Sequence, residues 1–241
     1  MNAAVELSTV THFHEDSPIV RIDVCAIEPS PVYPAIFASA MFDARRSLHP
    51  AMRVVAQPDH RGLLASLERA TCTLAAMSAS NAARAILDGA PVKIVCAAVS
   101  PADYASIAGE PLVPWDVVGD RVRSLPPRAV LVAPTRLLDV DPDSVRSAIE
   151  TYWHGAVLAA REPVMLSVVL ATELGLPPAA AEQEARRSVS AWRLEPAVRT
   201  EGLELVIASL GGDHAARGTR PEWLLDERFV RADWMRRSLR A

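Results

Sequence analysis

The chain has 241 residues, of which 50% are hydrophobic and 22% are charged, and this balance excludes an intrinsically disordered protein. Its 25 basic and 29 acidic residues give a formal net charge of −4, so no excess of cations is available for nucleic-acid phosphates. The length suits one full domain or two small ones.

The first sixteen residues predict a cytoplasmic protein, unless a leader has been removed. They have neither the basic segment nor the apolar core of a secretory signal. No run approaches the roughly 20 apolar residues that a membrane span needs, so we expect no membrane insertion. The three cysteines, Cys25, Cys72 and Cys96, lack the CxxC spacing of zinc sites. Each lies in or beside an apolar segment, which favours buried and inert thiols.

The first hundred residues alternate between strand patterns and helix patterns. The predicted strands are 19–27, 51–56, 72–76 and 92–99. Helices are predicted at 34–46 and 63–69, and residues 77–81 lead into a third helix that runs to Leu87. Such alternation is typical of an α/β fold with mainly parallel strands. Ligands of sheets of this kind bind at the carboxyl ends of the strands.

The next segment, 100–127, contains five prolines and no lasting periodicity, so we predict a connecting loop. A further strand is predicted at 128–133. Helices are then predicted at 141–160, 163–174, 178–191 and 203–210. The first of these has the strongest start signal, because Asp141 is a good cap and Pro142 suits the first helical position.

Several stretches together resemble the type 2 periplasmic binding proteins of the sulfonate, nitrate and thiamine-precursor group. They include Gly-Ala-Pro-Val-Lys-Ile-Val at 89–95 and Thr-Glu-Leu-Gly-Leu-Pro at 172–177. Similar stretches lie at 21–40, 129–149 and 221–230. The resemblance implies a reduced lobe of that fold, with a mainly parallel sheet flanked by helices and a helical carboxyl-terminal region.

The family's second lobe has no room in this chain. Only residues 100–127 stand where it would be inserted, and a single parallel βαβ unit already takes about 30 residues. The resemblance therefore implies one lobe in two parts, 19–99 and 128–241, joined by a loop at 100–127. We expect the open half of the cleft to be covered by a second subunit in a homodimer, by a partner protein or by this loop.

The resemblance also implies which turns line the ligand cleft. Mapped onto this chain, Glu28 and Tyr104 are candidates for catalysis, with Glu28 as general base. His60, in the turn after the second predicted strand, is a candidate general acid, and a plain loop histidine is the alternative. The candidates for ligand binding are Ser30, Tyr33, Gln57, Asp59, Arg61, Ser78, Ser80, Asn81, Ser100 and Asp103. Residues 78–81 begin a helix, where hydroxyl and amide groups can hold an anion, but simple capping by Ser78 or Ser80 remains an alternative. A solvated loop carboxylate is likewise the alternative for Glu28.

The sequence has no convincing motif for a cofactor or a metal ion. His12 and His14 could face one ion, but no third ligand has a fixed spacing from them. GxGxxG, GxxxxGK[ST], GxSxG and HExxH are all missing from the sequence. We therefore expect no cofactor and no resident metal.

Three functions stay open on this basis. The first is a biosynthetic enzyme, a lyase, isomerase or cyclase acting on a small anionic organic metabolite. The second is a solute-binding protein of an ABC importer. The third is a non-catalytic subunit that uses its open half-cleft to bind another protein.

Overall fold

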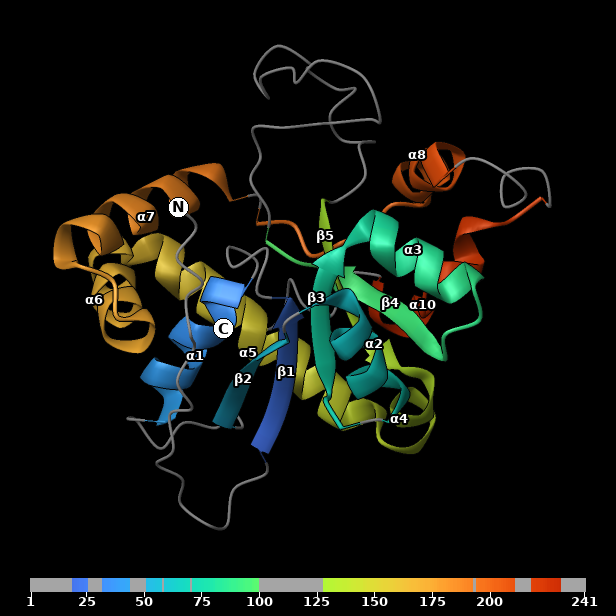
Figure 1. The fold of residues 1–241 in the computed structure, drawn as a ribbon, viewed down its shortest axis with the longest axis horizontal. Helices are drawn as coiled ribbons and strands as arrows, with labels where there is room; N and C mark the ends of the chain where they lie inside the picture. The colour runs from blue at the N-terminus through green and yellow to red at the C-terminus, as the bar shows by residue number, and fades with distance from the viewer. Residues whose placement is uncertain are drawn as a thin grey trace.

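A computed structural model shows five strands in one sheet with helices on both faces (Figure 1). The strands are β1 (Ile19–Cys25), β2 (Ala51–Gln57), β3 (Leu74–Ser78), β4 (Val92–Ala97) and β5 (Ala129–Pro134). The structure describes residues 19–25, 32–43, 51–57, 59–69, 71–99, 128–192, 194–210 and 218–230. The predicted loop at 100–127 lies outside these residues.

The strand order is β2-β1-β3-β5-β4. β1 pairs in parallel with both β2 and β3, whereas β5 is antiparallel to β3 and β4. Four strands therefore run in one direction and β5 alone runs back. The chain leaves β4 and enters β5 at the same edge of the sheet, where the amide of Ala98 donates to the carbonyl of Ala129 at 3.0 Å. A strand that starts at the carboxyl edge has to run against its neighbours.

Most helices begin and end where local signals place them. Asp141 caps α5 by accepting from the Ser144 amide at 3.1 Å, and Pro142 is its first residue. Gly175 ends α6 with a left-handed φ of 63°. The helices are α1 (Tyr33–Asp43), α2 (His60–Glu68), α3 (Ala79–Leu87), α4 (Thr135–Val140), α5 (Pro142–Arg161), α6 (Pro163–Leu174), α7 (Pro178–Ala191), α8 (Thr200–Leu210), α10 (Glu227–Val230) and the 3-10 helix η4 (Pro221–Leu224).

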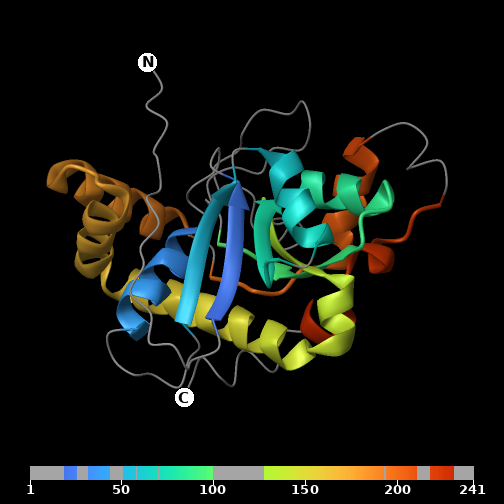
Figure 2. The same ribbon diagram turned by 60° about the horizontal axis from the view of Figure 1, so that its bottom comes forward.

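The sheet separates two hydrophobic clusters. One holds buried residues of α1, α5, α6 and α7, and the other holds those of α2, α3 and α8. α5 runs across one face of the sheet, behind β1 and β2 in the view of Figure 2. It approaches α1 so closely that a Cβ built on Gly155 would lie 2.3 Å from the carbonyl oxygen of Pro34. Only a residue without a side chain allows this contact.

The outer edge of β4 is covered by the segment around η4. The amide of Asp226 donates to the carbonyl of Ile94 at 3.0 Å, and Ile94 forms a bridge with Leu225. Lys93, the single lysine of the chain, donates from Nζ to the carbonyl oxygen of Trp223. This lysine therefore stabilises the sheet edge, which agrees with its place in a predicted strand.

In the part of the chain that the structure describes, no single helix is both long and apolar enough to cross a membrane. α5 and α6 reach the required length and apolarity only when they are taken together, and the two are bent by 115° at the break between them.

Candidate functional site

The carboxyl ends of the parallel strands form one edge of the sheet, and three helices begin there. Cys25 at the end of β1 pairs with Gln57 at the end of β2, and Ser78 ends β3 beside the start of β5. α1, α2 and α3 each follow one of these strands. The positive ends of three helix dipoles therefore lie along this edge, which favours negatively charged groups.

The start of α3 is held by its own cap. The Ser78 hydroxyl accepts from the Asn81 amide at 3.2 Å, and the Ala79 amide donates to the carbonyl of Arg128 at 3.1 Å. Ser80 is exposed. Capping thus accounts for Ser78, whereas the side chains of Ser80 and Asn81 are not used by the cap.

His60 and Asn81 join the starts of α2 and α3. Asn81 Nδ2 lies 2.8 Å from His60 Nε2, although 21 residues separate the two in the sequence. In this arrangement the amide NH₂ donates to Nε2, so the proton of a neutral His60 ring sits on Nδ1. His60 Nδ1 is buried, and the described residues supply no partner for it. A hydrogen-bond donor without an acceptor is therefore present at the edge where anions are favoured.

Two of the predicted ligand residues instead fix α2 in place. Asp59 caps α2 by accepting from the Gly62 amide at 2.7 Å. Gln57 donates from Nε2 to the Ser66 hydroxyl on α2 at 3.1 Å. Arg61, in the first turn of α2, is exposed. Asp59 and Gln57 position the helix start that carries His60, and Arg61 leaves a cation on its solvent side.

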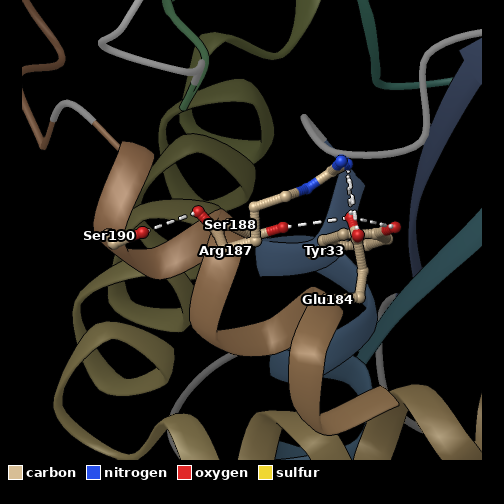
Figure 3. Close-up of polar contacts among 5 residues, drawn as sticks. All are labelled: Tyr33, Glu184, Arg187, Ser188 and Ser190. Atoms are coloured by element: carbon tan, nitrogen blue, oxygen red, sulfur yellow. Dashed lines mark hydrogen bonds and ion pairs between the residues drawn. The ribbon is translucent and has the colours of Figure 1, made fainter. Parts of the chain in front are cut away.

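Tyr33 lies on the opposite face of the sheet, where it binds α7. Its hydroxyl donates to Glu184 Oε1 at 3.1 Å, and the Ser188 hydroxyl donates to the same oxygen at 3.2 Å (Figure 3). Arg187 completes the group with an ion pair to Glu184 Oε2 at 3.2 Å. Burial, together with the charge of Glu184, raises the pKa of Tyr33 well above its ordinary value. The structure therefore does not bring Tyr33 together with His60 and Asn81, and its hydroxyl is committed to Glu184.

The end of β4 rests on aromatic side chains of α5. The amide of Val99 donates to the Tyr152 hydroxyl at 3.1 Å, and the rings of Tyr152 and Trp153 pack edge to face at 5.7 Å. Burial raises the pKa of the Cys96 thiol, beside Trp153, to about 12. Cys72 is also buried. These two thiols fit the prediction of inert cysteines.

Sequence reasoning missed Glu184 and Trp192 at this end of the molecule. Glu184 belongs to a charged stretch, 182–187, that resembles a solvated helix surface. A signal was present, because the buried residues Ala181, Ala185 and Ser188 mark the inner face next to it. Trp192 is 8% exposed and follows the last residue of α7. Nothing in its local pattern predicts burial.

Several predicted residues cannot be placed in this geometry. Glu28, Ser30, Ser100, Asp103 and Tyr104 lie outside the described residues, as do His12 and His14. Within the residues that are described, no group of three or more His, Cys, Asp or Glu side chains is arranged to hold a metal ion.

Comparison with known proteins identifies the fold by shape and not by sequence. No protein-family model and no curated protein sequence matches the chain. Solved structures do match. The ligand-binding component of an ABC-type import system from Staphylococcus aureus, solved with zinc bound, superposes with a TM-score of 0.63 and 10% identity over 88% of this chain and 97% of that one.

Two further structures give the same result. The periplasmic aliphatic sulphonate binding protein SsuA from Escherichia coli has a TM-score of 0.59 and 12% identity, over 88% of this chain and 93% of that one. The periplasmic nitrate-binding protein NrtA from Synechocystis has a TM-score of 0.58 and 10% identity, over 93% and 89%. At such low identity the likeness concerns the backbone alone. The chain therefore has the α/β fold of the type 2 periplasmic binding proteins.

Proposed function

We propose that this chain is a solute-binding protein that holds a small anionic organic molecule at the carboxyl edge of its sheet. Proteins of similar fold support this, since their names describe an ABC import system, a sulphonate-binding protein and a nitrate-binding protein. Among solute-binding proteins, these neighbours favour a component of an ABC importer. We therefore prefer solute binding to the biosynthetic enzyme that was named first from the sequence.

The observation that carries the proposal is the contact between His60 and Asn81 at the converging starts of α2 and α3. Both helices have nine residues and direct their positive ends to this edge. The buried His60 Nδ1, which has no partner among the described residues, adds a donor. Arg61 adds a full positive charge nearby in the chain. Oxygen atoms of a carboxylate or sulfonate are the groups that such donors bind best.

The segment 100–127 is proposed to be a connecting loop that stands in place of a second lobe. The amide of Ala98 donates to the carbonyl of Ala129, so residues on either side of this segment are hydrogen-bonded to each other. A homodimer, a partner protein or this loop as the cover of the open half-cleft stays a prediction, and so does the cytoplasmic location. The lyase or isomerase activity also stays a prediction, because the candidate residues Glu28 and Tyr104 lie outside the described residues.

Binding of simple anions tests the proposed site. Titration calorimetry of the purified chain with nitrate, methanesulfonate and succinate is expected to give saturable binding of at least one of them. Replacing His60 or Asn81 with alanine should weaken that binding roughly 10-fold or more, because each loses a hydrogen bond to a charged group.

The control is Gln183→Ala, which removes an amide from an exposed position on α7 and should leave the affinity unchanged. If no probe binds the folded protein, the proposed function is wrong. If His60→Ala and Asn81→Ala both bind as tightly as the parent, the site lies elsewhere.

Replacement of residues 100–127 by a short Gly-Ser linker tests whether this segment only connects two parts of one lobe. Because Ala98 and Ala129 are already hydrogen-bonded, a short connection closes the gap at little entropic cost. The shortened protein is expected to keep its circular dichroism spectrum and its cooperative unfolding. Loss of cooperative unfolding would show that the segment is more than a connection.

A further inference from the structure

The outward face of α6 is apolar although it is exposed. Val164, Met165 and Val168 are 67%, 39% and 53% exposed. Val164, Val168 and Thr172 are spaced four residues apart, so they lie in one row along the helix, with Met165 beside the row. The opposite side of α6 is buried in the core. The helix is therefore apolar on both sides, which is typical of a helix that is covered all round.

The few polar groups of α6 do not change the character of this face. Glu173 is the only charged residue of the helix. The Thr172 hydroxyl donates to the carbonyl of Val168 at 2.9 Å, and the Ser167 hydroxyl donates to the carbonyl of Val164 at 2.7 Å. Both hydroxyl protons are thus used inside the helix. The outward face of α6 offers neither a charge nor a spare hydroxyl donor to a partner.

The helices beside α6 have ordinary polar surfaces. α7 carries an exposed ion pair between Arg186 and Glu182, and α5 carries one between Arg146 and Asp143. α6 and α7 lie beyond α1, at the end of the molecule away from β4 (Figure 1 and Figure 2). Exposed apolar side chains that form a continuous row with polar neighbours mark contact sites, unlike those scattered singly. The face of α6 is therefore a candidate contact surface.

We propose that this face is a homodimer contact, in which α6 packs antiparallel against α6 of a second copy about a two-fold axis at Val168. An uncharged face is complementary to itself, and a two-fold contact uses the same face of both copies. The axis places Val164 opposite Thr172 of the partner subunit. The ends match in charge, because the exposed Arg161 just before α6 meets the negative dipole end of the other helix, beside Glu173 of the partner subunit.

Charge argues against a membrane surface as the occupant of this face. Helices that lie on membranes carry lysine or arginine on their polar side, whereas the charge of α6 itself is negative. The whole chain has a net charge of −4 and a single lysine, so anionic lipids would repel it.

The size of the face predicts a weak dimer. α6 has 12 residues and is therefore about 18 Å long. One face of such a helix covers well under the roughly 800 Å² per partner of a standard interface, so we expect a dissociation constant on the order of 100 μM. The contact is separate from the proposed anion site, because α6 belongs to the hydrophobic cluster on the other face of the sheet from α2 and α3.

Sedimentation equilibrium of the purified chain measures the dimer. Between roughly 10 and 1,000 μM the parent is expected to pass reversibly from monomer to dimer. Val168→Glu places two carboxylates against each other at the axis and should weaken the dimer at least 10-fold. The matched control is Val140→Glu, which puts the same charge on a residue of α4 that is 77% exposed and should dimerise like the parent. Both replacements are on exposed side chains, so both proteins should unfold as cooperatively as the parent.

A cysteine at the axis tests its position. Two copies of Val168→Cys face each other there, so mild oxidation should join them through a disulfide, whereas Val140→Cys should stay unlinked. If the parent remains a monomer over the whole range, or if Val168→Glu dimerises as well as the parent, the inference is wrong. A dimer in which Val168→Cys does not link would overturn the antiparallel arrangement. Co-sedimentation of the parent with phosphatidylglycerol vesicles, lost in Val168→Glu, would make a membrane the partner and overturn it as well.

Discussion

Replacing Gly155 with alanine is expected to lower the free energy of unfolding by about 2–3 kcal/mol. In an exposed helix the same change stabilises a protein by up to about 1 kcal/mol. Here the new Cβ would lie 2.3 Å from the carbonyl oxygen of Pro34 and 2.9 Å from Ala38 Cβ. Both obstacles are backbone or a short side chain that cannot rotate away, so α1 and α5 must separate. Overpacking of a dense core costs typically 1–3 kcal/mol, and urea denaturation measures the loss.

Gly175→Ala is the matched control, because it makes the same chemical change in open space. Gly175 has a φ of 63° and nothing within 4 Å of a built Cβ. The expected cost is about 1 kcal/mol, from the left-handed backbone alone. If Gly155→Ala is as stable as the parent, α1 and α5 do not touch at this point. The difference between the two variants isolates the helix contact.

The protein is expected to unfold steeply above about pH 10. Burial raises the pKa of Tyr33, Tyr152 and Cys96, the last to about 12 from its ordinary 9.0. The unfolded chain releases these three protons near pH 9 to 10, whereas the folded chain keeps them. The unfolded state then binds fewer protons, so stability is fully present below about pH 9 and is lost as the pH rises toward the folded pKa values. With three protons involved, the free energy of unfolding should fall by about 4 kcal/mol per pH unit near pH 11.

Replacing one residue at a time measures how much that group contributes to the slope of the free energy of unfolding against pH. Urea denaturation of Tyr33→Phe and of Cys96→Ala, followed from pH 7 to 11.5, should each show a slope smaller by about 1.4 kcal/mol per pH unit. At pH 7 Tyr33→Phe should also cost about 1 kcal/mol, because the hydrogen bond to Glu184 is lost. A free energy of unfolding that does not change between pH 9 and 11.5 would contradict the burial of these groups.

Helix starts show how far local signals reach. The Asp141–Pro142 pair predicted the start of α5 correctly, and the predicted end of α6 at residue 174 is confirmed, with Gly175 as its cap. The start of α2 was predicted three residues too late, because Asp59 was assigned to a ligand-binding turn, whereas its side chain caps the helix. α4 was missed, since it has six residues and no side-chain cap. Short helices of this kind depend on their packing against neighbours, and local patterning carries little of that information.

The candidate site was likewise predicted only in part from the sequence. Which turns lie at the carboxyl edge follows from the alternation of strands and helices, since parallel strands end on the same side of a sheet. Which side chains meet there does not follow. Tyr33 contacts Glu184 across 151 positions of sequence, and His60 contacts Asn81 across 21.

By itself the sequence determined the α/β class, the helix caps and the candidate edge of the sheet, because hydrophobic period and capping act over a few neighbouring residues. The tertiary structure alone decided that β5 runs back, that Tyr33 is occupied by α7 and that the indole N–H of Trp192 is buried without a described partner. Those outcomes depend on how distant segments cross and pack. The residues next to a side chain in the sequence do not indicate which distant residues it contacts in the folded protein.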